Sequence, residues 1–235
     1  MRQKIVVVVI FLLFIALSST LYYQYKENQK YISYLSSTTF TDFSSRIHSP
    51  IQYNREMYSD IIESETISIY QLEQLLRYNS AISRKIHKYD KLALNTLNRI
   101  DDIDDSFFRN PESIGNFFIL FAKSLSQEDG YKNYQAWLLE TDDSKEYPLN
   151  QSQLEKILII QSVNELWKQS FLEHLGDVLY PDKGGVRTSS TAKYHKNGIK
   201  DDYWVNIILS MKEKTNEFLK SYESADTLGD ILLDY

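Results

Sequence analysis

The feature that most restricts the fold is a long stretch without glycine or proline. Neither residue occurs between Pro50 and Pro111, and all seven glycines lie at or after Gly115. Sheets need turns, and turns are usually made with these two residues. A stretch of this length that is rich in Leu, Ile, Glu, Lys and Gln predicts long helices. We therefore expect an all-α chain.

Apolar residues recur at helical spacing and predict buried helix faces. The clearest face is formed by Leu75, Ile82, Ile86, Tyr89, Ala93, Leu97 and Ile100. A second face, expected at the centre of the core, is formed by Ile114, Phe117, Phe118, Phe121 and Leu125. Together these stripes predict an antiparallel helical bundle with long helices.

Helix ends are marked by capping residues, by proline and by glycine. Ser68 with Gln71 predicts a capping box. Asn110 followed by Pro111 predicts another helix start, and Gly130 the end of that helix.

Further boundaries are expected along the rest of the chain. The first helix is predicted from Tyr22 to about Ile47, ending before Pro50, and residues 51–63 form a separate short helix or begin the next one. A short helix is expected within residues 131–140, and a longer one begins at Asn150 or Ser152. Residues 181–200 are expected to be an irregular loop. Asp201 and Asp202 are expected to cap the last long helix, and the C-terminal apolar residues to dock back on the bundle.

The N-terminal segment is either a retained transmembrane helix or a cleaved signal peptide. The stretch from Ile5 to Leu17 has no polar residue. Its length is that of a signal-peptide core. If Ser18, Ser19 and Thr20 are tolerated, the segment reaches Tyr23 and is long enough to span a bilayer. Tyr22, Tyr23 and Tyr25 suit a membrane interface, so retention is expected. Cleavage near Ser18, with secretion, is the alternative.

Both alternatives place most of the chain outside the cytoplasm, because Arg2 and Lys4 precede the apolar segment. We expect residues 1–23 to be the signal-anchor and residues 24–235 to be an extracytoplasmic helical domain. The sequence has no cysteine, which excludes disulfides and thiolate chemistry and favours a bacterial exported protein.

The charge balance and the motifs restrict the activity. The chain has 26 basic and 32 acidic residues, a net charge of −6, which disfavours nucleic acid as a partner. His174 with Asp177 lacks a third metal ligand, and the acidic run at 101–105 lacks the glycine of a calcium-binding loop. No catalytic residue, metal ligand or cofactor is assigned from the sequence.

Basic residues gather in the predicted loop near the C-terminus. Within residues 183–200 there is no acidic residue, and the cationic or titratable side chains are Lys183, Arg187, Lys193, His195, Lys196 and Lys200. This group predicts a contact site for an anionic surface. A solvated loop with incidental charge is the alternative.

These patterns predict a membrane-tethered, non-enzymatic domain that binds a protein or an anionic envelope partner. Two alternatives remain open: a ligand-sensing domain of a membrane complex, and an envelope glycan hydrolase that uses carboxylates.

Overall fold

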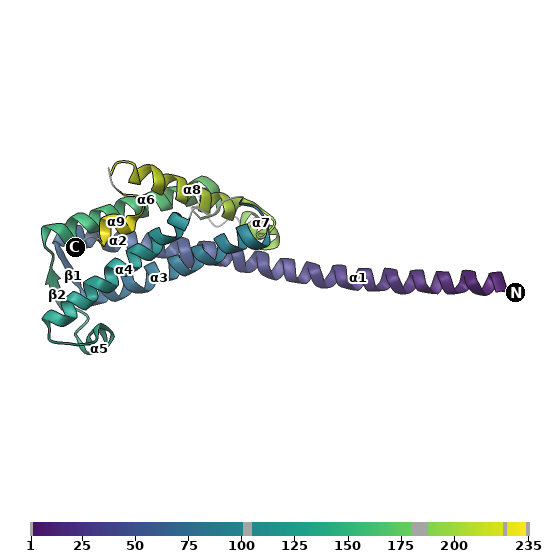
Figure 1. Cartoon of the computed structure of the whole chain (residues 1–235), viewed down its shortest axis with the longest axis horizontal. Helices are drawn as coiled ribbons and strands as arrows, with labels where there is room; N and C mark the ends of the chain where they lie inside the picture. Colours follow the sequence, from purple (N-terminus) through teal and green to yellow (C-terminus); the bar gives the residue numbers. More distant parts are fainter. Residues whose placement is uncertain (1, 101–104, 180–187, 223–224, 234–235) are drawn as a thin grey trace. The chain divides into compact units, whose positions relative to one another are not determined.

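The computed structural model describes residues 2–100, 105–179, 188–222 and 225–233. This part of the chain is mostly helical, so the all-α prediction is confirmed (Figure 1). Its α-helices are α1 (Arg2–Phe43), α2 (Ser49–Ser64), α3 (Ile69–Lys91), α4 (Asp105–Glu128), α5 (Tyr134–Glu140), α6 (Gln151–Leu179), α7 (Thr188–Asn197), α8 (Tyr203–Leu219) and α9 (Leu228–Leu232). It also contains the π-helical turns η1 (Ser44–His48) and η2 (Leu92–Thr96) and the strands β1 (Thr66–Ser68) and β2 (Glu146–Pro148).

The chain divides into two compact units. The N-terminal unit consists of Met1–Phe40 and Arg187–Asp201, and the bundle unit consists of Thr41–Val186 and Asp202–Tyr235. The predicted domain boundary after residue 23 stays a prediction. Among the described residues, no helix combines the length and the apolar character that crossing a membrane requires.

The bundle unit is built from helices that alternate in direction. β1 lies between α2 and α3, and β2 precedes α6, so the pairing of the two strands brings these helix ends together at one end of the unit (Figure 1). α2 therefore runs toward that end, while α3 and α6 run away from it. α3 packs on α2 and α4, α6 packs on α2 and α8, and α9 packs on α4.

The two-stranded ribbon was not expected from the sequence. Thr66 pairs with Pro148, Ile67 with Tyr147 and Ser68 with Glu146, in antiparallel register. Only three residues contribute to each strand, which is too short for an alternating pattern to be recognised. The ribbon buries Ile67 and most of Tyr147.

Asp129, just after α4, anchors the segment that leads into β2. Its carboxylate accepts hydrogen bonds from Trp137 Nε1 at 2.9 Å, from Lys145 Nζ at 2.7 Å and from the Tyr147 hydroxyl. The bonds from Lys145, Tyr147 and Trp137, in that order, lower the pKa of Asp129 to about 2. The α5–β2 segment is thus held to the end of α4 by one ionised side chain.

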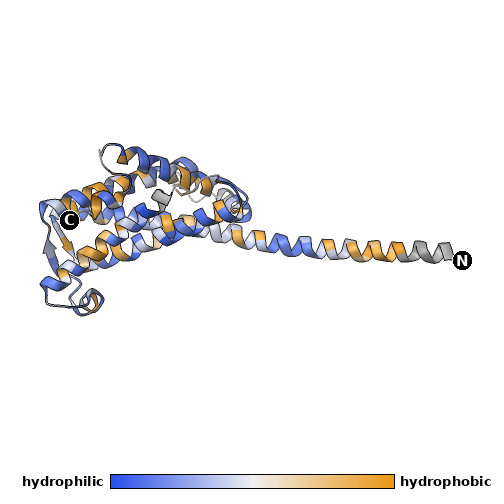
Figure 2. Cartoon of the chain, in the orientation of Figure 1, coloured by the Kyte–Doolittle hydropathy of each residue, from blue (hydrophilic) through white to orange (hydrophobic). Residues whose placement is uncertain are grey.

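The core of the bundle unit is rich in aromatic side chains. Ile114, Phe117, Phe118, Phe121 and Leu125 are all buried, which confirms the predicted face of α4. A second aromatic cluster forms where Phe43 contacts Tyr89 edge to face at 5.0 Å between ring centroids, with Trp204 packed against both. Figure 2 shows the hydrophobic residues of these helices as orange bands.

Several predicted helix ends are confirmed. Ser68 and Gln71 form the predicted capping box at the start of α3. Asn150 caps α6: Gln153 N–H donates to its Oδ1 at 2.9 Å, and the Gln153 side chain accepts from the Asn150 N–H. Gly130, with a φ of +82°, follows the end of α4.

The two prolines at predicted boundaries lie within helical segments instead. The expected break before Pro50 is wrong, because the π-helical turn η1 carries the chain from α1 directly into α2, where Pro50 occupies the first turn and needs no N–H donor. The expected start at Asn110 is also wrong, since α4 already begins at Asp105 and contains Pro111. The Asn110 Oδ1 accepts from the Leu228 N–H at 2.8 Å, so this side chain receives α9 rather than capping α4.

The expected irregular loop at residues 181–200 is wrong for the part that the structure describes, because Thr188–Asn197 forms α7. In the N-terminal unit, α7 packs on α1 through Phe40, whose ring stacks on Tyr194 and meets His195 edge to face. Gly198 allows this close approach, because a Cβ there would lie 2.6 Å from the Ser36 carbonyl oxygen.

The expected side-chain cap on the last long helix is also wrong. Asp202 precedes α8 but makes no capping hydrogen bond, and its Oδ1 pairs with Arg99 Nη1 at 3.1 Å.

We predict that Phe118→Ala lowers the free energy of unfolding by about 3–5 kcal/mol, because it removes a fully buried ring from the core. Leu139→Ala serves as the control, since Leu139 is 87% exposed and its truncation should change stability little. Urea unfolding followed by circular dichroism measures both. Equal midpoints for the two variants would contradict the assignment of the α4 face to the core.

A second prediction concerns pH. Burial, assisted by the charge of Lys168, lowers the pKa of His48 to about 4. Between pH 4 and the ordinary histidine pKa the unfolded chain binds the proton more tightly, so stability should fall by about 1–3 kcal/mol as the pH drops through that window. His48→Gln should flatten the stability–pH curve in this window, and His87→Gln at an exposed position should not. Superimposable curves for wild type and His48→Gln would contradict the prediction.

Candidate anion-binding groove

The basic residues predicted as an anionic contact site are only partly placed by the structure. Lys183 and Arg187 lie outside the described residues. Lys193, His195 and Lys196 lie on α7 and Lys200 follows it, all exposed. His195 Nδ1 lies 3.2 Å from Ser37 Oγ, and Lys193 lies 4.0 Å from Asp201 and over the Tyr194 ring. Their contact with an anionic surface stays a prediction.

A stronger concentration of positive charge lies in the bundle unit, in a groove between η1 and α3. The groove has a volume of about 340 Å³. Its lining residues are Ser45, Arg46, Pro50, Arg77, Tyr78, Ala81, Arg84 and Lys85. Four of these side chains are cationic, and none of the described residues that line the groove is acidic. We refer to this feature as the cationic groove.

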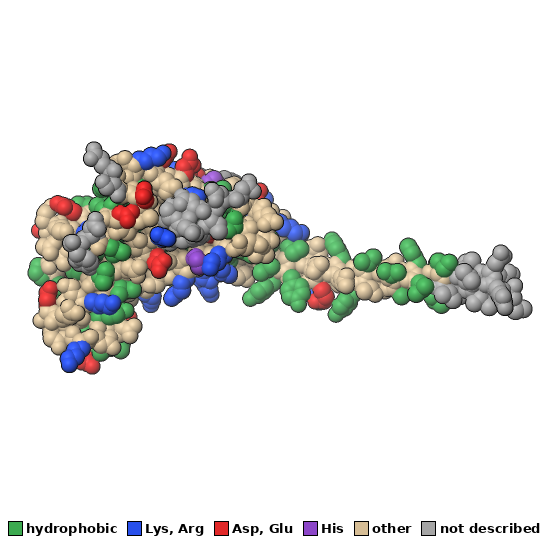
Figure 3. Space-filling view, in the orientation of Figure 1, with side chains coloured by type: hydrophobic (Ala, Val, Ile, Leu, Met, Phe, Trp, Pro, Cys, Tyr) green, Lys and Arg blue, Asp and Glu red, His purple; other side chains and the backbone are tan. Residues whose placement is uncertain are grey.

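The helical repeat of α3 places the basic residues of the cationic groove on one face. Arg77 and Arg84 are seven residues apart, and Lys88 and Lys91 continue the same face toward the end of the helix. At 1.5 Å per residue, this stripe is about 21 Å long. Figure 3 shows Lys and Arg side chains gathered along the lower edge of the bundle unit.

A buried carboxylate lies beside the cationic groove. The Asp42 side chain is 2% exposed. Lys85 Nζ donates to both of its oxygens at 2.9 Å, Lys88 Nζ lies 3.3 Å from Oδ2, and Arg46 Nη1 lies 3.3 Å from Oδ1. The Tyr89 hydroxyl donates to Oδ2 at 2.9 Å. One negative charge is therefore shared among three cations.

Two opposing influences act on the pKa of Asp42. Burial is the largest and raises the pKa, but the hydrogen bonds from Lys85, Tyr89 and Lys88 together lower it below the usual value for a carboxyl group. Asp42 is consequently ionised at neutral pH, and it holds the Lys85 ammonium at the edge of the groove.

The remaining two cations of the groove are held less firmly. Arg77 donates to the Gln74 side chain and to the Tyr78 hydroxyl, and its guanidinium lies over the Tyr78 ring. Arg84 is exposed and forms no hydrogen bond or ion pair within the described part of the chain. Its guanidinium is therefore available to a bound anion.

The groove was not predicted from the sequence, although one of its two components was recognisable there. The basic stripe on α3 could have been read from its spacing, since Arg77, Arg84, Lys88 and Lys91 recur at helical intervals. The contribution of Arg46 and Asp42 could not, because these residues are distant in sequence and reach α3 only through the packing of the helices.

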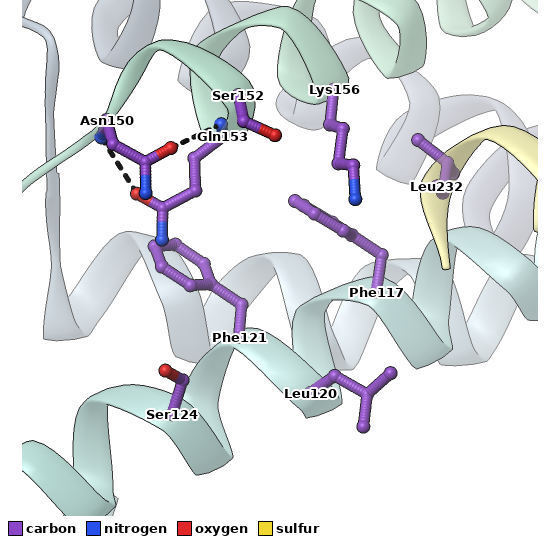
Figure 4. A pocket seen from close by; sticks show the side chains of 9 residues that line it. All are labelled: Phe117, Leu120, Phe121, Ser124, Asn150, Ser152, Gln153, Lys156 and Leu232. Atoms are coloured by element: carbon purple, nitrogen blue, oxygen red, sulfur yellow. Dashed lines mark hydrogen bonds between the residues drawn. The ribbon is translucent and has the colours of Figure 1, made fainter. Parts of the chain in front are cut away.

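A second hollow, of about 370 Å³, lies between α4, the start of α6 and α9 (Figure 4). The rings of Phe117 and Phe121 line it on the α4 side, and Leu232 comes from α9. On the α6 side, Figure 4 shows polar groups at residues 150–156, including the Asn150–Gln153 hydrogen bonds. The surface is thus apolar on one wall and polar on the other.

The described residues contain no group of three His, Asp or Glu side chains placed to hold an ion. Burial lowers the pKa of His174, so that its imidazole is neutral at neutral pH. Residues 101–104 of the acidic run lie outside the described residues, and Asp105 begins α4.

Comparisons of the chain with protein-family models, with curated protein sequences and with solved structures gave no match.

Proposed function

We propose that the protein is a membrane-held, non-enzymatic helical domain that binds a protein or an anionic component of the cell envelope. The segment from Ile5 to Tyr23 lies in the bilayer, and the bundle unit lies outside the cytoplasm. The cationic groove supplies the surface for the partner.

The observation that carries this proposal is the exposed apolar surface of α1. Large hydrophobic side chains are exposed at Ile10, Phe11, Leu12, Leu13, Phe14, Ile15, Leu17, Leu21, Tyr22, Tyr23 and Tyr25. Figure 2 shows the turns of α1 that follow its grey N-terminal end in orange, and the turns after them in white and blue. Because consecutive positions point in all directions around a helix, this segment is apolar on every side, and such helices are normally covered by protein or by lipid.

The residues on either side of the segment support a membrane location. Arg2 and Lys4 precede it, and basic residues are retained on the cytoplasmic side. Tyr22, Tyr23 and Tyr25 are exposed on α1, as expected for aromatic side chains at the level of the lipid headgroups. Cleavage near Ser18 followed by secretion is the alternative that the test below separates.

The chemistry of the cationic groove favours binding over catalysis. Acid–base hydrolysis of glycans uses a pair of carboxyl groups facing one cleft. The groove presents guanidinium and ammonium groups instead, and the carboxylate that pairs with Arg46 and Lys85, Asp42, is buried. This arrangement is suited to holding an anion.

A second candidate function, ligand sensing, is favoured by the hollow between α4, α6 and α9. Its volume of about 370 Å³ falls within the range of small-molecule sites. Aromatic rings on one wall and amide groups on the other suit an amphipathic ligand.

We predict that the mature protein keeps residues 5–23 and stays in the membrane fraction after a wash in high salt. Intact-mass measurement identifies the N-terminus. Phe11→Asp with Phe14→Asp should release the protein, because charges are costly in the bilayer. Tyr31→Asp with Tyr34→Asp adds the same charge to exposed positions of α1 beyond the segment and should leave the protein in the membrane.

A mature N-terminus at Ser19, with the protein in the medium, would contradict anchoring. The partner is sought by chemical cross-linking on intact cells, followed by purification of the full chain. Recovery of a specific protein or polymer would support binding. Turnover of a glycan by the purified chain would overturn the non-enzymatic assignment.

A further inference from the structure

We infer that the cationic groove is a binding site for the phosphate groups of a linear phosphodiester polymer, with successive phosphates lying along α3. This inference rests on the proposed function, because it names the chemical class of the partner that the groove receives. Arg77 and Arg84 bind the phosphates directly, and Arg46 and Lys85 supply charge at the edge of the groove.

The charge of the site requires more than one negative group. Four cations line the groove, and Asp42 offsets only one of these charges while also pairing with Lys88. A single carboxylate would leave most of this positive charge uncompensated. A chain with a negative charge on every repeat unit provides several anions at once and releases the counterions that the groove attracts.

The geometry of the cations suits phosphate. A guanidinium presents parallel N–H donors that match two oxygens of one phosphate group. Arg84, which has no partner in the described part of the chain, can engage a phosphate without losing an existing bond. Arg77 is positioned over Tyr78 by the stacking of its guanidinium on the ring, at 4.9 Å.

The apolar part of the groove suits the carbon linker between phosphates. Pro50, Ala81 and the Tyr78 ring lie among the four cations. In a polymer that alternates phosphate groups with short carbon units, the phosphate groups would lie against the guanidinium groups. The carbon units would lie against Pro50, Ala81 and the Tyr78 ring.

The basic stripe extends beyond the groove, which favours a polymer over a single phosphate. Lys88 and Lys91 are exposed on the next turns of α3. An extended chain can follow the stripe from the groove along these turns.

The test uses the full chain in an uncharged maltoside detergent and fluorescently labelled poly(glycerol phosphate). Arg77→Gln with Arg84→Gln should weaken binding by about tenfold or more and flatten its dependence on salt. Lys123→Gln with Lys132→Gln removes the same charge from exposed positions outside the groove and should change the affinity by less than about twofold. Arg84→Lys keeps the charge but loses the parallel N–H donors of the guanidinium, so it should give an intermediate affinity.

Specificity is measured with polyglutamate of similar length and with inorganic phosphate, both of which should bind more weakly than the phosphodiester polymer. Equal binding of polyglutamate, or equal losses in the two double variants, would overturn the inference. So would equally tight binding of glycerophosphoglycerol, the isolated headgroup of phosphatidylglycerol, because the groove would then need a single lipid headgroup rather than a polymer. Binding in detergent does not depend on membrane retention, so failure here leaves the anchoring result untouched.

Discussion

The ion pairs of Asp42 are the interaction that fixes the end of α1 against α3 and sets how much positive charge faces the cationic groove. This carboxylate is buried and remains ionised because Lys85, Lys88 and the Tyr89 hydroxyl donate to it. Burial of a charge without such partners would be strongly unfavourable. The pairs with Lys85 and Lys88 join the end of α1 to α3, and Arg46 of η1 approaches the same carboxylate. Phe43, beside Asp42, enters the aromatic cluster with Tyr89. The same contacts that close the core therefore gather an excess of positive charge at the surface.

Much of the fold follows from local signals that act over one or two helical turns. The absence of glycine and proline between Pro50 and Pro111 predicts helices, the Ser68–Gln71 box predicts the start of α3, and the phenylalanines of α4 predict a buried face. Two of the failures, at Asn110 and in the expected loop, occur where a distant contact overrides a local preference. Asparagine is a common N-cap residue, yet the Asn110 side chain accepts a hydrogen bond from the Leu228 backbone N–H. Pro50 is accommodated because a π-helical turn precedes it. The expected loop becomes α7, which packs on Phe40.

The candidate site was less predictable than the fold, because the packing of the helices decides which charged side chains lie together on the surface. The sequence analysis chose the basic residues between Lys183 and Lys200, which are adjacent in sequence. The structure instead brings Arg46 from η1 to the stripe on α3, which is a grouping across the fold. A buried acidic residue among them is also unexpected, since the sequence alone does not distinguish Asp42 from the other acidic residues. The helical stripe was readable, whereas the groove it borders depends on tertiary contacts.

The account is tested most directly by Asp42→Asn, measured for binding of poly(glycerol phosphate) by the full chain at a temperature where the variant is folded. Asparagine keeps the shape of the side chain and removes the one negative charge that competes for Arg46, Lys85 and Lys88. The account predicts a less stable protein that binds the polymer more tightly and with a steeper dependence on salt, since more positive charge faces the groove. Unchanged or weaker binding by the folded variant would contradict it, and would show that the excess charge beside Asp42 does not hold the anion.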